Sequence, residues 1–382
     1  MTLDPVYITH TGSFLPNNPV GNEQMETLLG QVGERPSRSR RLVLRSNQIQ
    51  TRYYAIDPET GEHNYTNAQL CARAVRKALG NKISLQEVSC LAAATSIADQ
   101  LMPGHGTMVH GELGSPACEV ANLSGICVSG MSAFKYAWLN VASGMHSTAV
   151  AAASEAASYS MKAGNFLPEL THRIQALEKH PEIAFEKDFL RWMLSDGAGA
   201  CVLQREKPNA LALQVHWLEL RSYAGEMPVC MYAGASKQRD QSLLGWQAVS
   251  AEQSRAESFM SVKQDVKVLN ENIVRYTVEK ALPEVIKQHQ LTPEQVDYFI
   301  PHYSSAYFRD RLDEGMRKVN FAIDQSRWFT NLSTKGNTGS ASIYIMLDEL
   351  FRSGRLQKGE KILCYVPESG RFSVSYMLLE VV

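Results

Sequence analysis

The stretch Asn122–Phe134 reads NLSGICVSGMSAF and holds a single cysteine, Cys127, between small and apolar residues. The residues before Cys127 have the apolar pattern of a buried strand, and the residues after it have the pattern of a helix. A thiol at the start of a helix lies near backbone N–H groups and the positive end of the helix dipole, and both favour the thiolate. On this stretch alone, two interpretations stay open. The thiol is reactive, or it is an inert cysteine that packs as a small hydrophobic residue, which is the more frequent case.

Strand and helix patterns alternate along the rest of the chain. Short runs of small or branched apolar residues predict buried strands at 6–9, 90–95, 117–123, 147–154, 198–204, 211–220, 297–301, 361–366 and 373–382. Longer apolar or amphipathic stretches predict helices at 67–79, 129–144, 265–288 and 338–354. The alternation in both halves of the chain predicts an α/β fold.

One segment interrupts this alternation. Residues 161–194 lie between two predicted strands and are longer than a simple connection requires. A lid or cap over a site, a structural excursion and a dimer contact are all consistent with this segment.

The α/β pattern of both halves predicts that the chain divides into two tightly packed parts. The first is 1–206, which includes the cap insertion 161–194, and the second is 207–382.

Bulk composition excludes several classes of protein. Lys and Arg number 38 and Asp and Glu number 39 in 382 residues, so the net charge of −1 provides no general attraction to nucleic acid or an anionic membrane. No run of 18 apolar residues is present, and the first residues lack the pattern of a signal peptide, so we expect no membrane span. The seven cysteines are odd in number and form no CxxC motif, which indicates a reducing compartment and a cytoplasmic location.

Two segments of the second half contain residues that are suited to assist a thiol. His302 follows the predicted strand 297–301, where an open α/β sheet usually presents its chemistry. Asn337 lies in the glycine-flanked turn KGNTGSAS before the helix 338–354. Each residue also has a structural interpretation, because lone histidines are often satisfied within the fold and asparagine often caps a helix.

Together these segments resemble the β-ketoacyl-acyl-carrier-protein synthase III branch of the thiolase-like condensing enzymes. The resemblance extends over nearly the whole chain, since the family's segments occur here in the family's order: THTGSFLPNNPVGN (9–22), LRSNQIQTRYYA (44–55), the Cys127 stretch, SDGAGACVL (195–203), PHYSS (301–305) and KGNTGSAS (335–342). The resemblance implies a duplicated, five-layered αβαβα arrangement of thiolase-like type, and a homodimer.

The resemblance also implies a reaction. Cys127 attacks an acyl thioester and carries the acyl group. His302 and Asn337 then donate hydrogen bonds to the thioester oxygen of a second substrate, a malonyl-type or β-ketoacyl thioester. The carbanion of this substrate attacks the acyl-Cys127 carbonyl, and a carbon–carbon bond forms in a Claisen-type condensation.

The implied partners are acyl carrier protein or coenzyme A thioesters, and no cofactor is required. The loop arginines Arg45 and Arg52 either contact the phosphate of the carrier or have a purely structural role. We expect no metal, because the most plausible zinc set lacks a usual ligand spacing and is placed in a loop: His105, His110 and Cys118.

Two segments depart from the family pattern. The family often has a glycine-rich loop near its last strand, whereas this chain reads PESGRFSVS and retains a single glycine, Gly370, between Glu368 and Arg371. The substrate-gate region, which often has an aromatic residue before a proline, has Met102 at that place. A flexible methionine favours an acyl pocket that tolerates bulk. Met102, Arg45, Gly370 and Arg371 are therefore the predicted substrate-binding residues.

These departures and the cap insertion favour a ketosynthase of secondary metabolism over a housekeeping fatty-acid initiator. The narrower hypothesis is an enzyme that joins two acyl chains, as in dialkylresorcinol or aryl-polyene pathways, with a downstream cyclase or aromatase as a further partner.

One alternative keeps acyl-Cys127 but transfers the acyl group to an alcohol or amine, with His302 as general base. The other alternative is a non-catalytic partner subunit, which the retention of Cys127, His302 and Asn337 argues against.

Overall fold

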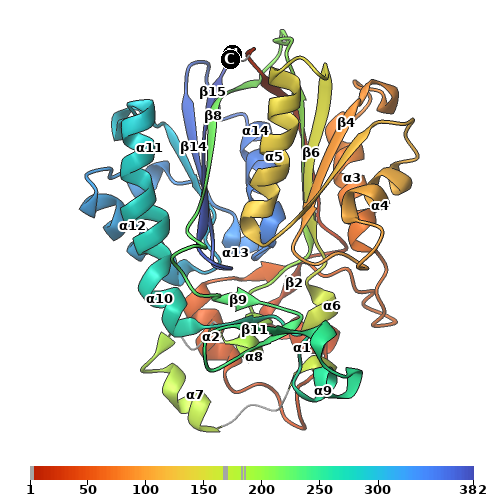
Figure 1. Cartoon of the computed structure of the whole chain (residues 1–382), viewed down its shortest axis with the longest axis vertical. Coiled ribbons are helices and arrows are strands. Elements are labelled where there is room, and N and C mark those ends of the chain that lie inside the picture. The colour runs from red at the N-terminus through yellow and green to blue at the C-terminus, as the bar shows by residue number, and fades with distance from the viewer. Residues whose placement is uncertain (1–3, 167–170, 182–183, 185) are drawn as a thin grey trace.

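The computed structural model describes residues 4–166, 171–181, 184 and 186–382 of the chain. Its centre is a nine-stranded mixed sheet (Figure 1), formed by β1 (Tyr7–Phe14), β4 (Cys90–Thr95), β5 (Glu119–Ser124), β6 (Thr148–Glu155), β7 (Gly197–Gln204), β8 (Leu213–Ser222), β13 (Tyr298–Pro301), β14 (Lys361–Glu368) and β15 (Ser373–Val381). The strand order is β13–β14–β15–β8–β1–β7–β6–β4–β5. The strands of the first half of the chain thus occupy one side of the sheet, and those of the second half occupy the other.

The two sides of the sheet meet at a short junction and enclose two helices. Strands β1 and β8 pair through Tyr7 with Gln214 and Ile8 with Leu213. The enclosed helices are α5 (Cys127–Ala142) and α14 (Ser342–Arg352), which lie between the two groups of strands in Figure 1. Both helices share one apolar core with strands of both halves. The cysteine stretch and the asparagine turn therefore belong to neighbouring central helices.

Further helices cover the two outer faces. Helices α3 (Asn67–Leu79) and α4 (His105–Leu113) form a second core with strands of the first half. Helices α10 (Val266–Val274), α11 (Ala281–His289) and α12 (Arg309–Lys318) form a third core with strands of the second half. The layers run α–β–α–β–α, so the predicted five-layered α/β fold is confirmed. The division at residues 206 and 207 stays a prediction.

Two local expectations are wrong. Strand β5 was expected to be buried but is the edge strand of the sheet and partly exposed, because no neighbour in the described chain pairs with its outer side. The stretch that contains His105 and His110 was expected to be a loop, but it forms α4 and packs against β4 and β5. The predicted helix 265–288 is confirmed, with a π-helical segment at 275–280 between α10 and α11.

Small elements gather at one end of the sheet (Figure 1). They include two short helices of the predicted cap region, the helices just before it and at 251–256, and four short strands: α7 (Thr171–Leu177), α8 (Lys187–Leu190), α6 (Ser158–Met161), α9 (Ala251–Ala256), β9 (Met231–Tyr232), β10 (Ala235–Lys237), β11 (Leu243–Gly245) and β12 (Lys263–Gln264). Positions 167–170, 182–183 and 185 of the cap insertion lie outside the described residues. Within the described ranges, no helix is long and apolar enough to cross a membrane.

Candidate active site

A cavity of about 1600 Å³ opens where the parallel strands β5, β6, β13 and β14 end. This volume exceeds the roughly 300–1,000 Å³ of ordinary small-molecule pockets. The residues at these strand ends include Cys127, Glu155, His302 and Pro367. Asn337 lines the same cavity from the loop before α14. The structure thus brings together Cys127, His302 and Asn337 from three separate segments of the chain.

Cys127 is the first residue of α5. The preceding residue, Ile126, has a non-helical backbone, and its carbonyl accepts hydrogen bonds from the backbone nitrogen and the hydroxyl of Ser129 at 3.1 and 2.6 Å. Burial raises the pKa of the Cys127 thiol, and the negative charges of Glu368 and Glu155 raise this pKa further. These effects outweigh the helix N-terminus, which the sequence analysis expected to favour the thiolate. The resting thiol is protonated, so its attack requires a proton acceptor.

His302 follows β13 directly and is 4% exposed. Its backbone nitrogen donates to the carbonyl of Tyr365 on β14 at 2.8 Å, which fixes the residue at the cavity wall. Burial lowers the pKa of the imidazole to about 4. His302 is therefore neutral near pH 7 and can donate one N–H, but it is a weak base.

Asn337 lies between α13 (Leu332–Lys335) and α14, in a turn that is fixed by backbone hydrogen bonds. Its nitrogen donates to the carbonyl of Met193 at 3.0 Å, and its carbonyl accepts from the nitrogen of Ser195 at 2.9 Å. The side-chain oxygen accepts from the nitrogen of Gly339 at 3.0 Å. Because the oxygen is engaged in the turn, the amide N–H2 is the end of the side chain that can donate to a substrate.

A close helix–loop contact sets the distance between the cysteine and asparagine segments. A Cβ at Gly130 would lie 2.3 Å from the carbonyl oxygen of Ser340, so only glycine permits this approach. The hydroxyl of Tyr344 donates to the Gly130 carbonyl at 2.7 Å. The buried carboxylate of Glu155 accepts from the nitrogen and hydroxyl of Ser340 at 3.1 and 2.5 Å. These contacts connect the two halves of the chain at the site.

Glu368, the last residue of β14, also reaches the start of α5. Its Oε2 accepts a hydrogen bond from the backbone nitrogen of Val128 at 3.0 Å. Burial raises the pKa of this carboxyl group. In the sequence, Glu368 stood out as a departure from a glycine-rich loop, without a predicted role. The one feature of the sequence that could have pointed to this contact is an acidic residue at a position where the family usually has small residues.

The predicted substrate-binding residues lie elsewhere than the cavity lining. Arg45 is exposed on α2 (Arg40–Asn47), and Met102 is 84% exposed, while its neighbour Leu101 lines the cavity. Gly370 packs against Ile126, since a Cβ there would lie 3.1 Å from that side chain. Arg371 points away and donates from Nε to a backbone carbonyl at 3.0 Å.

Arg52 and Asp196 form a buried polar support behind the site. The guanidinium of Arg52 donates to Oδ1 of Asn22 at 2.7 Å and to the carbonyl of Trp192 at 3.2 Å. Asp196 accepts from the nitrogen of Ala55 at 2.6 Å, and burial raises its pKa to about 6. Of the two interpretations of Arg52, these contacts favour the structural one.

Much of the cavity wall comes from two segments outside the predicted site residues. One is the cap insertion, which contributes lining residues on both sides of its undescribed positions: Gly164, Asn165, Phe166, Leu190, Met193 and Leu194. The other is the segment 231–262, with β9 and the loops around α9: Met231, Tyr232, Trp246, Val249, Met260 and Val262. The cap was one expectation for 161–194, whereas the segment 231–262 lacks strong periodicity, so no pattern in the sequence placed it at a cavity.

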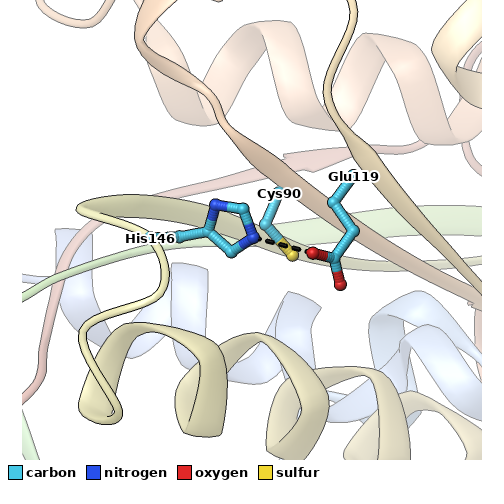
Figure 2. Close-up of side chains that lie close together, drawn as sticks. All are labelled: Cys90, Glu119 and His146. Carbon is cyan, nitrogen blue, oxygen red and sulfur yellow. Dashed lines mark hydrogen bonds and ion pairs between the residues drawn. The ribbon is translucent and has the colours of Figure 1, made fainter.

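The described residues also contain one group with metal-ligating atoms close together, formed by Cys90, Glu119 and His146 (Figure 2). His146 and Glu119 form an ion pair at 2.8 Å between Nε2 and Oε2, and the hydroxyl of Tyr136 on α5 donates to the other oxygen of Glu119. Both carboxylate oxygens are therefore engaged. The group ties β5 to α5 and to the loop before β6, away from the residues that line the cavity.

Comparison with known proteins agrees with this geometry. Residues 286–375 match the family described as 3-Oxoacyl-[acyl-carrier-protein (ACP)] synthase III C terminal. The chain is 22% identical to the β-ketoacyl-acyl-carrier-protein synthase III of Chlamydia pneumoniae over 357 residues, which cover 92% of this chain and 90% of that protein. The chain is thus similar to synthase III condensing enzymes over nearly its whole length. The predicted acyltransferase class is thereby confirmed.

Solved structures agree on the fold of this synthase III-like chain. AbyA1, a tetronic acid condensing enzyme, matches with a TM-score of 0.74 at 20% identity, over 98% of this chain and 99% of that one. OleA of Xanthomonas campestris with bound lauric acid and lauroyl-CoA matches with a TM-score of 0.73 at 18% identity, over 100% of both chains. The thiolase-like fold predicted from the sequence is confirmed.

Proposed function

We propose that the protein forms a carbon–carbon bond between two acyl thioesters, with Cys127 as nucleophile and His302 and Asn337 as hydrogen-bond donors. The observation that carries this proposal is the convergence of these three side chains on one large cavity. They come from the start of a helix, the end of a strand and a turn, and each is held by backbone contacts. Acyl transfer requires such a preformed group of nucleophile and donors.

In the first half-reaction, the sulfur of Cys127 attacks the thioester carbonyl of the first substrate. The proton of the Cys127 thiol passes to the departing carrier sulfur, so the carrier leaves as a thiol and the acyl group remains on Cys127 as a thioester. The tetrahedral oxyanion develops at the start of α5, where a backbone N–H group and the helix dipole stabilise negative charge. The backbone nitrogen of Cys127 is the donor that we assign to it.

In the second half-reaction, His302 and Asn337 donate to the thioester oxygen of the second substrate. The neutral state of His302 suits this role, because a neutral imidazole donates without protonating the enolate. Each donor contributes about 3–4 kcal/mol to the transition state. The enolate forms when the second substrate loses CO2, if it is of the malonyl type, or an α-proton, if it is of the β-ketoacyl type. Its carbon attacks the acyl-Cys127 carbonyl, a carbon–carbon bond forms, and the thiolate of Cys127 leaves.

The size and lining of the cavity favour long or bulky acyl chains. Its volume of about 1600 Å³ and its apolar lining, which includes Phe166, Leu194 and Trp246, suit two extended chains better than an acetyl group. A solved relative holds lauric acid and lauroyl-CoA, and another is a tetronic acid condensing enzyme. We therefore assign this protein to secondary lipid or polyketide synthesis, with chain joining of the dialkylresorcinol or aryl-polyene type as the specific hypothesis.

The partners follow from the same assignment. Acyl carrier protein or coenzyme A delivers the thioesters, and a cyclase or aromatase acts on the product. A homodimer is supported by the outer side of β5, which pairs with no strand among the described residues, and by the exposed side chains of Leu101 and Met102. Light scattering of the purified protein tests this state, and a monomer would contradict it.

Product analysis tests the bond that is formed. Purified protein is mixed with an acyl thioester and a second thioester, or with an alcohol or amine acceptor. We expect a product whose mass equals the condensed carbon skeleton. Ester or amide as the only product would contradict the proposal. The lowered pKa of His302 makes it a poor general base for an alcohol, so the structure favours condensation over that alternative.

A further inference from the structure

The carboxylate of Glu368 lies in the first turn of α5, beside the candidate nucleophile. Its Oε2 accepts from the nitrogen of Val128 at 3.0 Å, one residue beyond Cys127. Its other oxygen, Oε1, lies beside Gly370, where a Cβ would approach it to 3.3 Å. The absence of a side chain at Gly370 therefore leaves space around Oε1.

The loop that carries Glu368 is fixed on its outer side. The nitrogen of Cys230 donates to the carbonyl of Gly370 at 2.8 Å, and the nitrogen of Met231 donates to the carbonyl of Ser369 at 3.2 Å. The side-chain amide of Gln264 donates to the hydroxyl of Ser369 at 2.8 Å. These contacts hold the carboxylate in place, as a group that transfers a proton in a reaction requires.

Glu368 and Glu155 are the two carboxylates whose charge acts on Cys127. Glu155 is engaged by four hydrogen bonds from the nitrogens and hydroxyls of Ser96 and Ser340. All four bonds reach Oε1 and favour the ionised form of Glu155. Burial raises the pKa of both carboxyl groups, but Glu368 has fewer donors to offset it, because it accepts only from the backbone nitrogens of Val128 and Ile126. Of the two carboxylates, Glu368 is the one suited to accept and return a proton.

We propose that Glu368 is the catalytic base of the condensation, and that the second substrate is a thioester with an acidic α-C–H, of the β-ketoacyl class, which reacts without loss of CO2. This inference rests on the proposed function. A malonyl-type substrate would bring a third carboxylate close to Glu155 and Glu368. Among the described lining residues, Arg255 on α9 supplies the only permanent positive charge.

The proton balance of this step closes within the site. Glu368 removes the α-proton of the second thioester, and the electron pair moves into the enolate whose oxygen is held by His302 and Asn337. The α-carbon then attacks the acyl-Cys127 carbonyl. A carbon–carbon bond forms, the carbon–sulfur bond to Cys127 breaks, and the thiolate takes the proton from Glu368. The thiol and the carboxylate are restored without an external acid or base.

A structural role is the alternative, because the carboxylate also caps the start of α5. The variant Glu368→Gln separates the two roles. A glutamine oxygen still accepts the hydrogen bond from Val128, but the amide cannot take a proton. The matched control is Glu380→Gln, which lies at the other end of the β14–β15 hairpin and contacts His216 at the surface.

The experiment first loads Cys127 with an acyl group and measures the loading by intact-protein mass. The acyl-enzyme is then mixed with a β-ketoacyl thioester, and its consumption is followed in a single turnover. We expect Glu368→Gln to be acylated like the wild type, and to consume the acyl group about 10²–10⁴-fold more slowly. The wild-type rate should fall as the pH drops through the pKa of Glu368, because the base must be ionised. Burial raises this pKa, so the fall should begin at a higher pH than for an ordinary glutamate. The control variant should behave as wild type.

Three outcomes separate the claims. If Glu368→Gln condenses at the wild-type rate, Glu368 is not the catalytic base. Faster consumption of the acyl-enzyme by a malonyl thioester, with release of CO2, would overturn the assigned substrate class. A wild-type protein that is never acylated would contradict the proposed function itself.

Discussion

The surroundings of His302 and Asn337 decide what each side chain can do in the site. The sequence located both residues correctly after a strand and in a glycine-flanked turn. It did not predict that burial keeps His302 neutral, because burial depends on how β13 and β14 pack. It also predicted a more acidic thiol at Cys127, since the helix start is visible in the sequence, but the burial of the thiol and the approach of Glu368 from β14, which raise its pKa, are not.

Removal of either donor should affect the second half-reaction alone. We expect His302→Ala and Asn337→Ala to lower the rate of condensation by roughly 10²–10³-fold, because each loses one hydrogen bond to the enolate. Acylation of Cys127 should remain within a few fold of wild type. Single-turnover kinetics with preloaded enzyme separates the two steps. Equal loss of acylation and condensation would mean that these residues act on the nucleophile instead.

At the scale of elements, the contact between α5 and the turn before α14 decides the site. The sequence predicted both helices and the glycines around Cys127. The specific need for glycine at 130 could not be predicted, because it arises from the carbonyl of Ser340, which is distant in the sequence. In contrast, the cavity wall formed by 231–264 consists of strands of two or three residues, which leave no periodic pattern to read.

Substitution of Gly130 tests this contact. Gly130→Ala places a Cβ within 2.3 Å of the Ser340 carbonyl, so α5 must shift away from the turn. We expect a loss of about 1–3 kcal/mol in the free energy of unfolding, measured with urea. Condensation should fall as well, because Cys127 and Asn337 move apart.

The matched control is Gly111→Ala on α4, where no atom lies within 4 Å of the added Cβ. There we expect a gain of about 0.5–1 kcal/mol, because alanine favours a helix interior over glycine. A loss at Gly111 as large as that at Gly130 would show that the close approach is not the cause.

At the scale of the whole molecule, the cavity lies where both halves, the cap insertion and the small strands meet. The sequence predicted the layered α/β fold because its strands and helices alternate regularly. The cavity volume could not be predicted, since it is set by the packing of segments that are distant in sequence. The apolar end of the cavity, which includes Leu269, Ile273 and Leu312 from α10 and α12, is the region that we assign to the acyl chain.

Partial filling of this region should shorten the accepted acyl chain. Ile273→Phe adds volume at the cavity wall, and we expect the longest acyl group loaded onto Cys127 to become shorter by several carbons. Loading of a short acyl group should persist, which shows that the variant is folded. An unchanged chain-length profile would place the acyl chain elsewhere in the cavity.

Intact-protein mass spectrometry of wild type and Cys127→Ala, after mixing with a panel of acyl-carrier-protein and acyl-coenzyme A thioesters, tests the central claim most directly. The account predicts an added mass equal to the acyl group on the wild type, with long chains accepted, and no added mass on Cys127→Ala. An unmodified wild type with every donor, or equal modification of the variant, would contradict the assignment of Cys127 as the nucleophile.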